Sequence, residues 1–384
     1  MLACQRDRFS LSHDEVYLNC AYMAPLSRRV VEAGVEGVRR KERPASIAPA
    51  DFFSGPDRVR ELFARLVGTG ADRVAIIPSV SYGMAVVARN TSLESGQHIL
   101  TLARQFPSHV YPWRRLAADT GAEVRVVGPP PGTDHRGRRW NEAILEAIGP
   151  RTALVAVPPV HWTDGTIFDL EAIGRRAREV EAALVVDGTQ SVGAHPFDCG
   201  RVQPDALVCA GYKWLTGPYA IGAMVLGERY AGGVPLEETW IGRRGSEHFG
   251  GLVDYQDRYR DGAARFDMGE GSNFILIPMF IAALEQVLEW TVDGIAEYCA
   301  RICAPAVQTV TGRGFGVEEE SWRAPHLFGI RLPDGLDPEA VRDTLAERRI
   351  SVSVRGGVIR VAPHVYNTEA DLEACAAALI GLVD

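Results

Sequence analysis

From about residue 56, short runs rich in β-branched residues alternate with longer amphipathic segments. The short runs have the length of buried strands: DRVAIIP, QHILTL, AEVRVV, TALVAVPPV and ALVVDGTQ. The longer segments have the apolar spacing of helices: DRVRELFARLV, VSYGMAVVARN, HVYPWRRLAADTG, NEAILEAIG and LEAIGRRAREVEA. Because strands and helices that alternate in this way form βαβ units, the sequence predicts an α/β fold. Its mostly parallel sheet should carry helices on both faces.

The pattern changes after about residue 260. A long helix is expected from Pro278 to about Val292, followed by strands in HLFGIRLP and ISVSVRGGVIRVAP and helices in LDPEAVRDTLAERR and TEADLEACAAALIGLV. This mixture predicts a small α+β C-terminal domain over residues 261–384, after a large domain over residues 23–260. Residues 1–22 are expected to form an N-terminal segment that packs on the small domain.

Charge and cysteine usage narrow the class of protein. The formal net charge of −8 argues against a nucleic-acid partner, because phosphate neutralisation needs a basic face. The seven cysteines show no CxxC spacing, which indicates reduced thiols in the cytoplasm. The start MLACQRDRFS has no apolar signal-peptide core, and NFILIPMFIAALEQVLEW is broken by Pro278 and Glu285. We therefore expect a soluble cytoplasmic protein with no membrane partner, and the spacing of the histidines predicts no metal site.

Lysine occurs only at positions 41 and 213, so 39 of the 41 basic residues are arginine. Lys41 lies in the charged run RRKER. Lys213 follows the apolar segment PDALVCAG and lies among glycines and aromatic residues. A guanidinium cannot lose its proton at physiological pH, whereas a desolvated amine can, and a Schiff-base nucleophile needs this. Lys213 is either such a nucleophile or a second chance survivor of the bias toward arginine.

Further polar and aromatic residues stand at strand ends, where open α/β sheets bind ligands. Asp187 ends the strand in ALVVDGTQS, although an aspartate there can also simply cap a turn. With Lys213 it meets a demand of pyridoxal phosphate, an acid facing the pyridine nitrogen. Val80 and Ser81 open a helix after VAIIP and could hold a phosphate, or Ser79 and Ser81 could merely cap that helix. Phe106 offers a flat face for a ring.

An enzyme that uses pyridoxal phosphate on amino acids also needs a group that binds the substrate carboxylate. Arg355 and Arg360 lie in VRGGVIRVAP, and an arginine fork can bind a carboxylate through two hydrogen bonds. Single arginines are weak signals in a chain so rich in arginine. The prediction therefore depends on the whole set of acid, lysine, phosphate loop, aromatic ring and arginine.

The segment VVDGTQSVGAHPFD, followed by CAGYKWLTGPYAIGAMVL, resembles the aminotransferase class V superfamily of pyridoxal-phosphate enzymes. That group includes cysteine desulfurases, kynureninases, isopenicillin-N-epimerase-like proteins and cystine C–S lyases. The likeness runs from VYLNCAYMAPLS to VIRVAPHVYNTEADL, nearly the whole chain. It implies fold type I, with a seven-stranded mixed sheet in the large domain, a small C-terminal domain, and a homodimer with active sites at the interface.

The resemblance also implies roles for residues of this chain. Lys213 would carry pyridoxal 5'-phosphate as a Schiff base, and Asp187 would pair with its pyridine nitrogen. Gln190 would lie near the ring hydroxyl, and Tyr212 would hydrogen-bond the phosphate. Arg360 matches the family's carboxylate-binding arginine.

Three further residues are open to two interpretations. Trp240 in TWIG and Asn273 in GSNF resemble segments that reach the site of the neighbouring subunit, or they are ordinary interface packing. Many members place an asparagine near the ring hydroxyl, and in PPVHWTDGT either His161 or Trp162 stands there instead. His161 is therefore a site residue or a packed histidine at a strand end.

The stretch RGGVIR carries no cysteine and leaves no room for the cysteine-bearing loop of desulfurases, so a desulfurase is not expected. The predicted function is that of a pyridoxal-phosphate aminotransferase on an amino acid or a derivative. The alternative is a β-eliminating C–S lyase, with an epimerase and a kynureninase-like hydrolase less favoured. A silent scaffold is disfavoured because Asp187, Gln190 and Lys213 are intact, and a NAD oxidoreductase because its glycine fingerprint is missing.

Overall fold

A seven-stranded sheet forms the centre of the larger part of the molecule. The computed structural model describes residues 1–383, and the strand order is β2-β8-β7-β6-β5-β3-β4. The strands are β2 (Val74–Ile77), β3 (His98–Leu102), β4 (Glu123–Val127), β5 (Thr152–Val157), β6 (Ala183–Asp187), β7 (Ala206–Ala210) and β8 (Gly222–Leu226). Strand β8 runs antiparallel to both of its neighbours, and the other pairs are parallel. The predicted α/β fold with a mixed seven-stranded sheet is confirmed.

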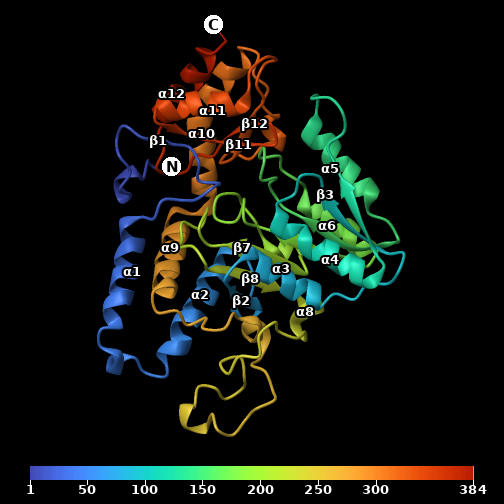
Figure 1. Ribbon diagram of the computed structural model, residues 1–384, viewed down its shortest axis with the longest axis vertical. Helices are drawn as coiled ribbons and strands as arrows, with labels where there is room; N and C mark the ends of the chain where they lie inside the picture. The colour runs from blue at the N-terminus through green and yellow to red at the C-terminus, as the bar shows by residue number, and fades with distance from the viewer. Residues whose placement is uncertain (384) are drawn as a thin grey trace.

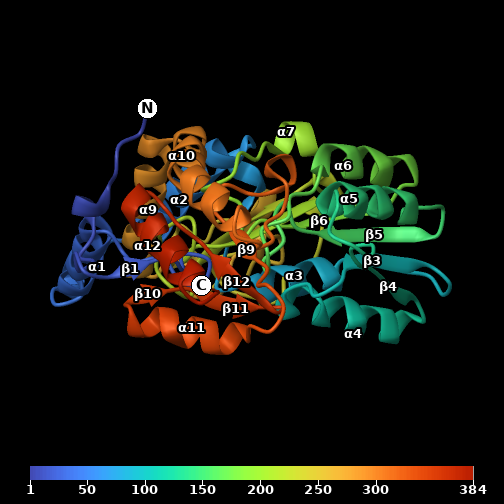
Figure 2. The same cartoon turned by 90° about the horizontal axis from the view of Figure 1, so that it is seen from above.

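Helices cover both faces of this sheet (Figure 2). Helices α3 (Val80–Arg89) and α4 (Tyr111–Thr120) lie on one face, and α5 (Arg136–Ala147), α6 (Leu170–Glu179) and the short α7 (Cys199–Val202) lie on the other. The inner strands are mostly apolar because both of their faces are buried, whereas the edge strand β4 carries Glu123 and Arg125 and is partly exposed. In β6, Leu184 and Val186 point into one core while Ala183 and Val185 point into the other.

The smaller part stands at one end of the molecule and contains the C-terminus (Figure 1). Its antiparallel sheet has the order β11-β12-β9, with strands β9 (Phe328–Ile330), β11 (Ser353–Arg355) and β12 (Val358–Val361). Its helices are α10 (Val292–Thr311), α11 (Pro338–Glu347) and α12 (Glu369–Ile380). Strand β1 (Val16–Tyr17) pairs in parallel with β10 (Ile350–Ser351), so the start of the chain lies against this part.

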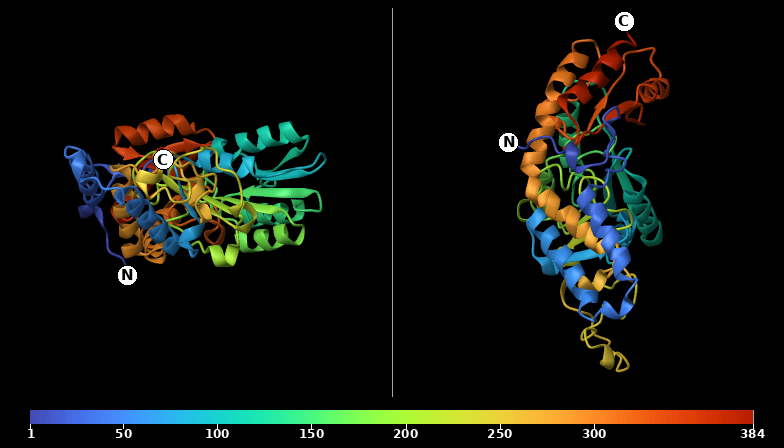
Figure 3. Two further views of the ribbon diagram at one scale, coloured as in Figure 1. Left: turned by 90° about the horizontal axis from the view of Figure 1, so that it is seen from below. Right: turned by 90° about the vertical axis from the view of Figure 1, so that its left-hand side faces the viewer.

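Helix α9 (Leu276–Trp290) packs with the large sheet, beside α1 (Arg28–Arg40) and α2 (Asp51–Val67). Ile277, Phe280 and Leu284 belong to the core of that sheet. The chain then turns at Thr291, which caps α10, so that α9 and α10 follow one another along the side of the molecule (Figure 3). The helices of the smaller part begin with α10 at Val292. The domain division at residue 260 stays a prediction.

One long segment lies away from the sheets. Residues 232–261 follow the short helix α8 (Glu228–Ala231) and form a long segment, coloured yellow, that projects from the end opposite the small sheet (Figures 1 and 3). Within residues 1–383, none of the helices combines the length and the apolar character needed to cross a bilayer.

The turn after β5 joins the two parts of the molecule. Gly165 has φ +76°, and its carbonyl accepts a hydrogen bond from the backbone N–H of Ala324 at 2.9 Å. A Cβ at position 165 would collide with the carbonyl oxygen of Leu327. This turn therefore requires glycine.

We expect Gly165→Ala to lower the free energy of unfolding by about 1–3 kcal/mol, because it adds left-handed strain to a backbone collision. Urea denaturation followed by circular dichroism would measure this loss. Gly149→Ala is the matched control, since a Cβ there meets no atom within 4 Å. An equal effect of both substitutions would contradict the prediction.

Candidate active site

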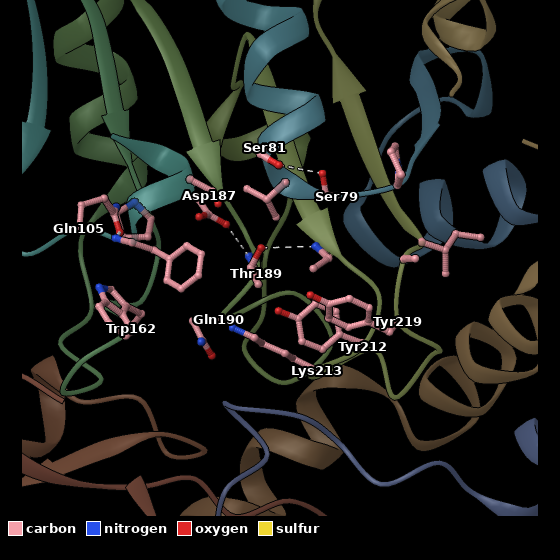
Figure 4. A pocket seen from close by; sticks show the side chains of 18 of the residues that line it. Ser79, Ser81, Gln105, Trp162, Asp187, Thr189, Gln190, Tyr212, Lys213 and Tyr219 are labelled. Carbon is pink, nitrogen blue, oxygen red and sulfur yellow. Dashed lines mark hydrogen bonds between the residues drawn. The ribbon is translucent and has the colours of Figure 1, made fainter. Parts of the chain in front are cut away.

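A cavity of about 240 Å³ opens at the carboxyl ends of the parallel strands (Figure 4). Its walls come from the turns that follow β2, β3 and β5, from the end of β6, and from the segment between β7 and β8. This is where α/β sheets bind ligands, because loops from several strands meet there. The polar and aromatic lining residues include Ser79, Ser81, Gln105, Phe106, Trp162, Asp187, Thr189, Gln190, Tyr212, Lys213 and Tyr219.

Lys213 projects into this cavity from the tight segment between β7 and β8 (Figure 4). Its side chain is buried, and the Nζ atom lies 5.4 Å from the ring centre of Phe106 and 5.6 Å from that of Tyr212. Burial and, to a smaller extent, the positive charge of Arg360 lower the pKa of Lys213 to about 8, against the opposing effect of Asp187. Near neutral pH this amine is therefore deprotonated far more often than that of an ordinary lysine, which lets it act as a nucleophile or base.

Asp187 ends strand β6 and is buried. Its Oδ1 accepts a hydrogen bond from the backbone N–H of Thr189 at 3.0 Å, and its Oδ2 lies 4.0 Å from Nδ1 of His109. Burial lowers the pKa of His109 to about 4, so this histidine is neutral at neutral pH. The carboxylate thus has no charged histidine beside it and can serve a positive group inside the cavity.

His109 was not predicted from the sequence. Both of its ring nitrogens lack hydrogen-bond partners among the described residues, and the ring is fully buried against Asp187 and Trp113. It stands three residues after Phe106, in the first turn that follows β3. This spacing puts His109 on the same turn as Phe106, and it was the sequence signal that could have pointed to His109.

Gln190 lines the cavity but is already hydrogen-bonded on both sides. Its Oε1 accepts from Trp214 Nε1 at 2.9 Å, and its Nε2 donates to the carbonyl of Ala21 at 3.1 Å. Its backbone carbonyl accepts from His326 Nε2 at 2.8 Å. These bonds tie the N-terminal segment and the smaller part to the site, while the expected contact of Gln190 with a ring hydroxyl stays a prediction.

The helix α3 presents its N-terminus to the cavity. Ser79 caps the helix by accepting a hydrogen bond from the N–H of Tyr82 at 3.2 Å, and the Ser79 and Ser81 hydroxyl oxygens are 2.9 Å apart. Both interpretations of this segment therefore apply, since Ser79 caps the helix and leaves Val80 and Ser81 facing the cavity. The first N–H groups of a helix have no partner within it and attract anions.

Tyr212 closes the same side of the cavity. Its ring centre lies 4.6 Å from that of Tyr219, and burial raises the pKa of Tyr212 to about 12. Because the phenol keeps its proton, it can donate a hydrogen bond to an anion held by helix α3.

The lining fits the expected cofactor. Gln105, which the sequence did not single out, accepts from the N–H of Phe106 at 2.7 Å through Oε1, and its buried Nε2 has no partner. This orphaned donor indicates that a ligand with an acceptor oxygen belongs here. With the amine of Lys213, the carboxylate of Asp187, the ring of Phe106 and a helix N-terminus, the cavity offers what pyridoxal phosphate requires.

His161 lies outside the cavity. Its ring is buried between Trp140 and Phe168, with Nδ1 at 2.8 Å from Thr163 Oγ1 and Nε2 at 3.2 Å from the carbonyl of Ala103. The tight turn at Gly165 directs the next side chain, Trp162, to the cavity instead. The placement favours the interpretation of His161 as a packed histidine.

Trp240 and Asn273 do not reach the cavity of their own chain. Trp240 packs against Phe52 and Phe249 within the projecting segment. Asn273 Oδ1 accepts hydrogen bonds from the N–H groups of residues 275 and 276 and thereby caps α9. Their expected contact with a neighbouring subunit stays a prediction.

The two arginines of the small sheet flank Trp162 rather than line the cavity. Arg360 is fully buried, donates through Nη1 to the carbonyl of Trp162 at 2.9 Å and through Nε to Ser353 Oγ at 3.1 Å. The guanidinium of Arg355 lies 5.9 Å from the Trp162 ring centre. Burial and the neighbouring charge of Arg355 lower the pKa of Arg360.

The lowered pKa of Lys213 gives a measurable pH dependence. In the cofactor-free protein, we expect labelling of Lys213 by an amine-reactive acylating reagent to reach half its maximal rate near pH 8 and to fall below that pH, where the amine is protonated. An ordinary lysine has a pKa of about 10.4, so Nα-acetyl-lysine in the same solution is the reference. Rates from peptide mass spectrometry with equal midpoints for both amines would contradict the prediction.

Comparison with known proteins places the chain in a family. The family model for aminotransferase class-V matches residues 40–375. An uncharacterized aminotransferase of Bacillus subtilis, YcbU, is 28% identical over 82% of this chain and 80% of its own length. The isopenicillin N epimerase of Amycolatopsis lactamdurans is 26% identical over 97% and 96% of the two chains.

Solved structures show the same fold. A C-DES mutant with glycine covalently linked to its pyridoxal phosphate cofactor superposes with a TM-score of 0.87 at 19% identity, covering 98% of this chain and 99% of the other. A complex of the cystine C–S lyase C-DES with cysteine persulfide gives a TM-score of 0.85 at 19% identity over 96% and 98% of the two chains. The family and the cofactor predicted from the sequence are confirmed. The chain belongs to the aminotransferase class-V family and is a pyridoxal-phosphate-dependent enzyme of fold type I.

Proposed function

We propose that this enzyme is an aminotransferase that acts on an amino acid or an amino-acid derivative. The observation that carries the proposal is the buried amine of Lys213, which lies in a cavity walled by Asp187 and Phe106 and whose pKa burial lowers to about 8. When bound, pyridoxal phosphate withdraws electrons from the α-carbon of an attached amino acid, which makes the α-proton removable. The Nζ atom of Lys213 is the base within reach of that proton.

The other residues take supporting roles in this proposal. Asp187 pairs with the pyridine nitrogen, and Phe106 stacks on the ring. Val80, Ser81 and Tyr212 hold the phosphate at the start of α3. On the substrate side, Arg360 binds the α-carboxylate. Trp162, whose carbonyl accepts a hydrogen bond from Arg360, shapes the wall of the cavity. Gln190 holds the floor of the cavity in place.

The ionisable groups of the cavity favour a reaction that uses one base. Its lining contains four ionisable side chains, Asp187, Tyr212, Lys213 and Tyr219. Burial raises the pKa of Tyr212 to about 12, and Asp187 faces the cofactor, which leaves Lys213 as the base. Epimerisation needs proton transfer on two opposite faces of the substrate and so two groups that carry protons. Transamination needs proton transfer on one face only, which a single base can perform. The relative YcbU, which is named an aminotransferase, agrees with this choice.

The thiols argue against a desulfurase. The hairpin between β11 and β12 turns at Gly356 and Gly357, both at positive φ, so it has no loop that could carry a cysteine to the substrate. Cys20 and Cys209 lie near Lys213 but are fully buried, and burial raises the pKa of Cys20 to about 12. A β-eliminating C–S lyase, which needs no protein thiol, is the second candidate, because the lyase structure shares the fold.

The test is a visible spectrum of the cofactor-loaded enzyme before and after a mixed pool of amino acids is added. An aminotransferase should lose the absorbance of the bound cofactor stably, release a 2-oxo acid, and regain the absorbance when a 2-oxo acid is added back. Recovery without addition, with ammonia accumulating, would identify the lyase instead. A protein that never binds pyridoxal phosphate would overturn both readings.

The proposal includes a homodimer in a reducing compartment such as the cytoplasm. Val31, Val35 and Val38 form an exposed apolar stripe along α1, and Trp240 is 40% exposed on the projecting segment. Apolar stripes of this kind are typical of subunit contacts. All seven cysteines are unpaired, as in reduced proteins. Sedimentation velocity would measure the mass of the wild-type protein and of Val35→Glu. A dimeric wild type and a monomeric variant would support a subunit contact through the stripe on α1.

A further inference from the structure

One face of the small sheet gathers three arginines. Arg355 of β11 lies opposite Val358 of β12. Continuing the pairing of β12 with β9 by one residue places Arg331 opposite Val358 on its other side. Arg360 is two residues from Val358 on the same strand, so its side chain leaves the same face. This face is turned toward the large sheet, since Arg360 bonds to Trp162 and Arg355 lies over its ring.

A second cavity, of about 390 Å³, lies between this face and the turns that follow β3 and β5. Arg331 and Arg355 enter it from the small sheet, and Arg104 and Arg136 enter it from the large part. Arg104 bridges the two sides by donating to the carbonyl of Gly356 at 3.0 Å. We call this cavity, with Arg104, Arg331 and Arg355, the arginine pocket.

The arginine pocket has an excess of positive charge. Arg136 is paired with Asp164 at 3.0 Å and Glu318 at 3.2 Å. Arg104, Arg331 and Arg355 make no ion pair with any residue of the described chain. Asp164, the carboxylate that lines the pocket, is thus already paired with Arg136 and does not neutralise the other arginines. Guanidinium groups that face one cavity repel each other unless an anion lies between them, and their forks match a carboxylate or a phosphate.

The arginine pocket adjoins the active-site cavity through one side chain. Trp162 lies between them, with Arg355 over its ring and with its ring centre 5.3 Å from that of Phe106 in an edge-to-face contact. The rows of Arg360 and Arg355 are two residues apart on the sheet, or about 7 Å at the rise of a strand. Two anion-binding groups at that spacing suit the two ends of a short dianionic amino acid.

We propose that the arginine pocket binds a distal carboxylate of the substrate, so that the enzyme prefers amino acids with acidic side chains. The proposal rests on the proposed function, because the α-carboxylate is held by Arg360. It adds the substrate class and a set of specificity-determining arginines. A phosphate or a sulfonate shares the required chemistry, and the experiment separates these from a carboxylate.

The first measurement compares kcat/KM of the cofactor-loaded enzyme for aspartate and glutamate with that for their neutral amides, asparagine and glutamine. A charge-assisted hydrogen bond contributes enough for a preference of about 10–100-fold for the acids. Arg331→Gln should lower this ratio about tenfold, while Arg331→Lys, which keeps the charge, should retain most of it. Arg348→Gln, an exposed arginine on the same part of the chain, should leave the ratio unchanged.

Phosphoserine and cysteate form the second arm of this comparison. If kcat/KM is higher for phosphoserine or cysteate than for both aspartate and glutamate, and Arg331→Gln removes this difference, then the arginine pocket binds a phosphate or a sulfonate rather than a carboxylate. Equal values for acids and amides in the wild type would overturn the proposal.

The second measurement does not depend on turnover. Calorimetric titration of the cofactor-free protein should show glutarate, a dicarboxylate, binding more tightly than butyrate, and Arg331→Gln should remove the difference. If no amino acid reacts at all, the proposed function fails, and only the calorimetric comparison of glutarate with butyrate tests the arginine pocket. Tighter binding of glutarate that depends on Arg331 then still supports an anion site in the arginine pocket. Equal binding of glutarate and butyrate overturns this site.

Discussion

Lys213→Ala is expected to lower kcat by about 10⁴-fold, the upper end of what a positioned general base contributes. The reason is that the amine is the base that the cavity places beside the cofactor, and a methyl group can neither bind the cofactor nor move a proton. The enzyme should also lose the visible absorbance of the bound cofactor. Stopped assays of oxo-acid formation and a spectrum of the purified variant would measure both effects.

Lys41→Ala is the matched control, since Lys41 is the other lysine of the chain and is exposed on the surface. It should keep full activity and full absorbance. A small amine such as methylamine, added at high concentration, should partly restore the turnover of Lys213→Ala, because the deleted group is a base in a formed cavity. Undiminished turnover in Lys213→Ala would contradict both the assigned base and the proposed reaction.

Asp187→Asn is expected to lower kcat by about 10²–10³-fold, the effect of removing one preorganised electrostatic partner. Asparagine can still accept the hydrogen bond from Thr189 through its Oδ1, so the end of β6 should keep its shape. It cannot hold a proton on the pyridine nitrogen, which weakens the electron withdrawal on which removal of the α-proton depends. Steady-state kinetics at saturating cofactor would measure the loss.

Two variants sharpen this test. Asp187→Glu keeps the charge but lengthens the side chain, so it should lose less activity than Asp187→Asn if charge is what counts. Asp254→Asn removes an exposed carboxylate of the projecting segment and should change nothing. If Asp187→Asn and Asp187→Glu lose the same activity, shape rather than charge explains the role of Asp187.

Much of the sheet could be predicted because most of its parallel strands are buried on both faces and appear as short apolar runs. Strand β8 shows the limit of that approach. It is as apolar as its neighbours, yet its direction is reversed, and strand composition does not encode direction. The available signal was the connection over residues 211–221, which is shorter than the dozen or more residues that a parallel crossover needs.

The meeting of Asp187, Phe106 and Lys213 in one cavity was predictable because each of them follows the end of a strand. The site was not predictable where it depends on how a turn directs a side chain. His161 and Trp162 are neighbours in the sequence, and the turn at Gly165 decides that the indole and not the imidazole faces the cavity. Gln105 and His109 were missed for the same reason, since their contacts arise from the turn after β3.

The bonds that cross between the two parts of the molecule have a consequence for its melting. The carbonyl of Gly165 is held by Ala324, and that of Gln190 by His326, so the walls of the cavity share hydrogen bonds with the smaller part. Loosening of either part removes partners from the other. The molecule should therefore unfold as one cooperative unit, and the heat-induced release of cofactor should coincide with the loss of the entire fold.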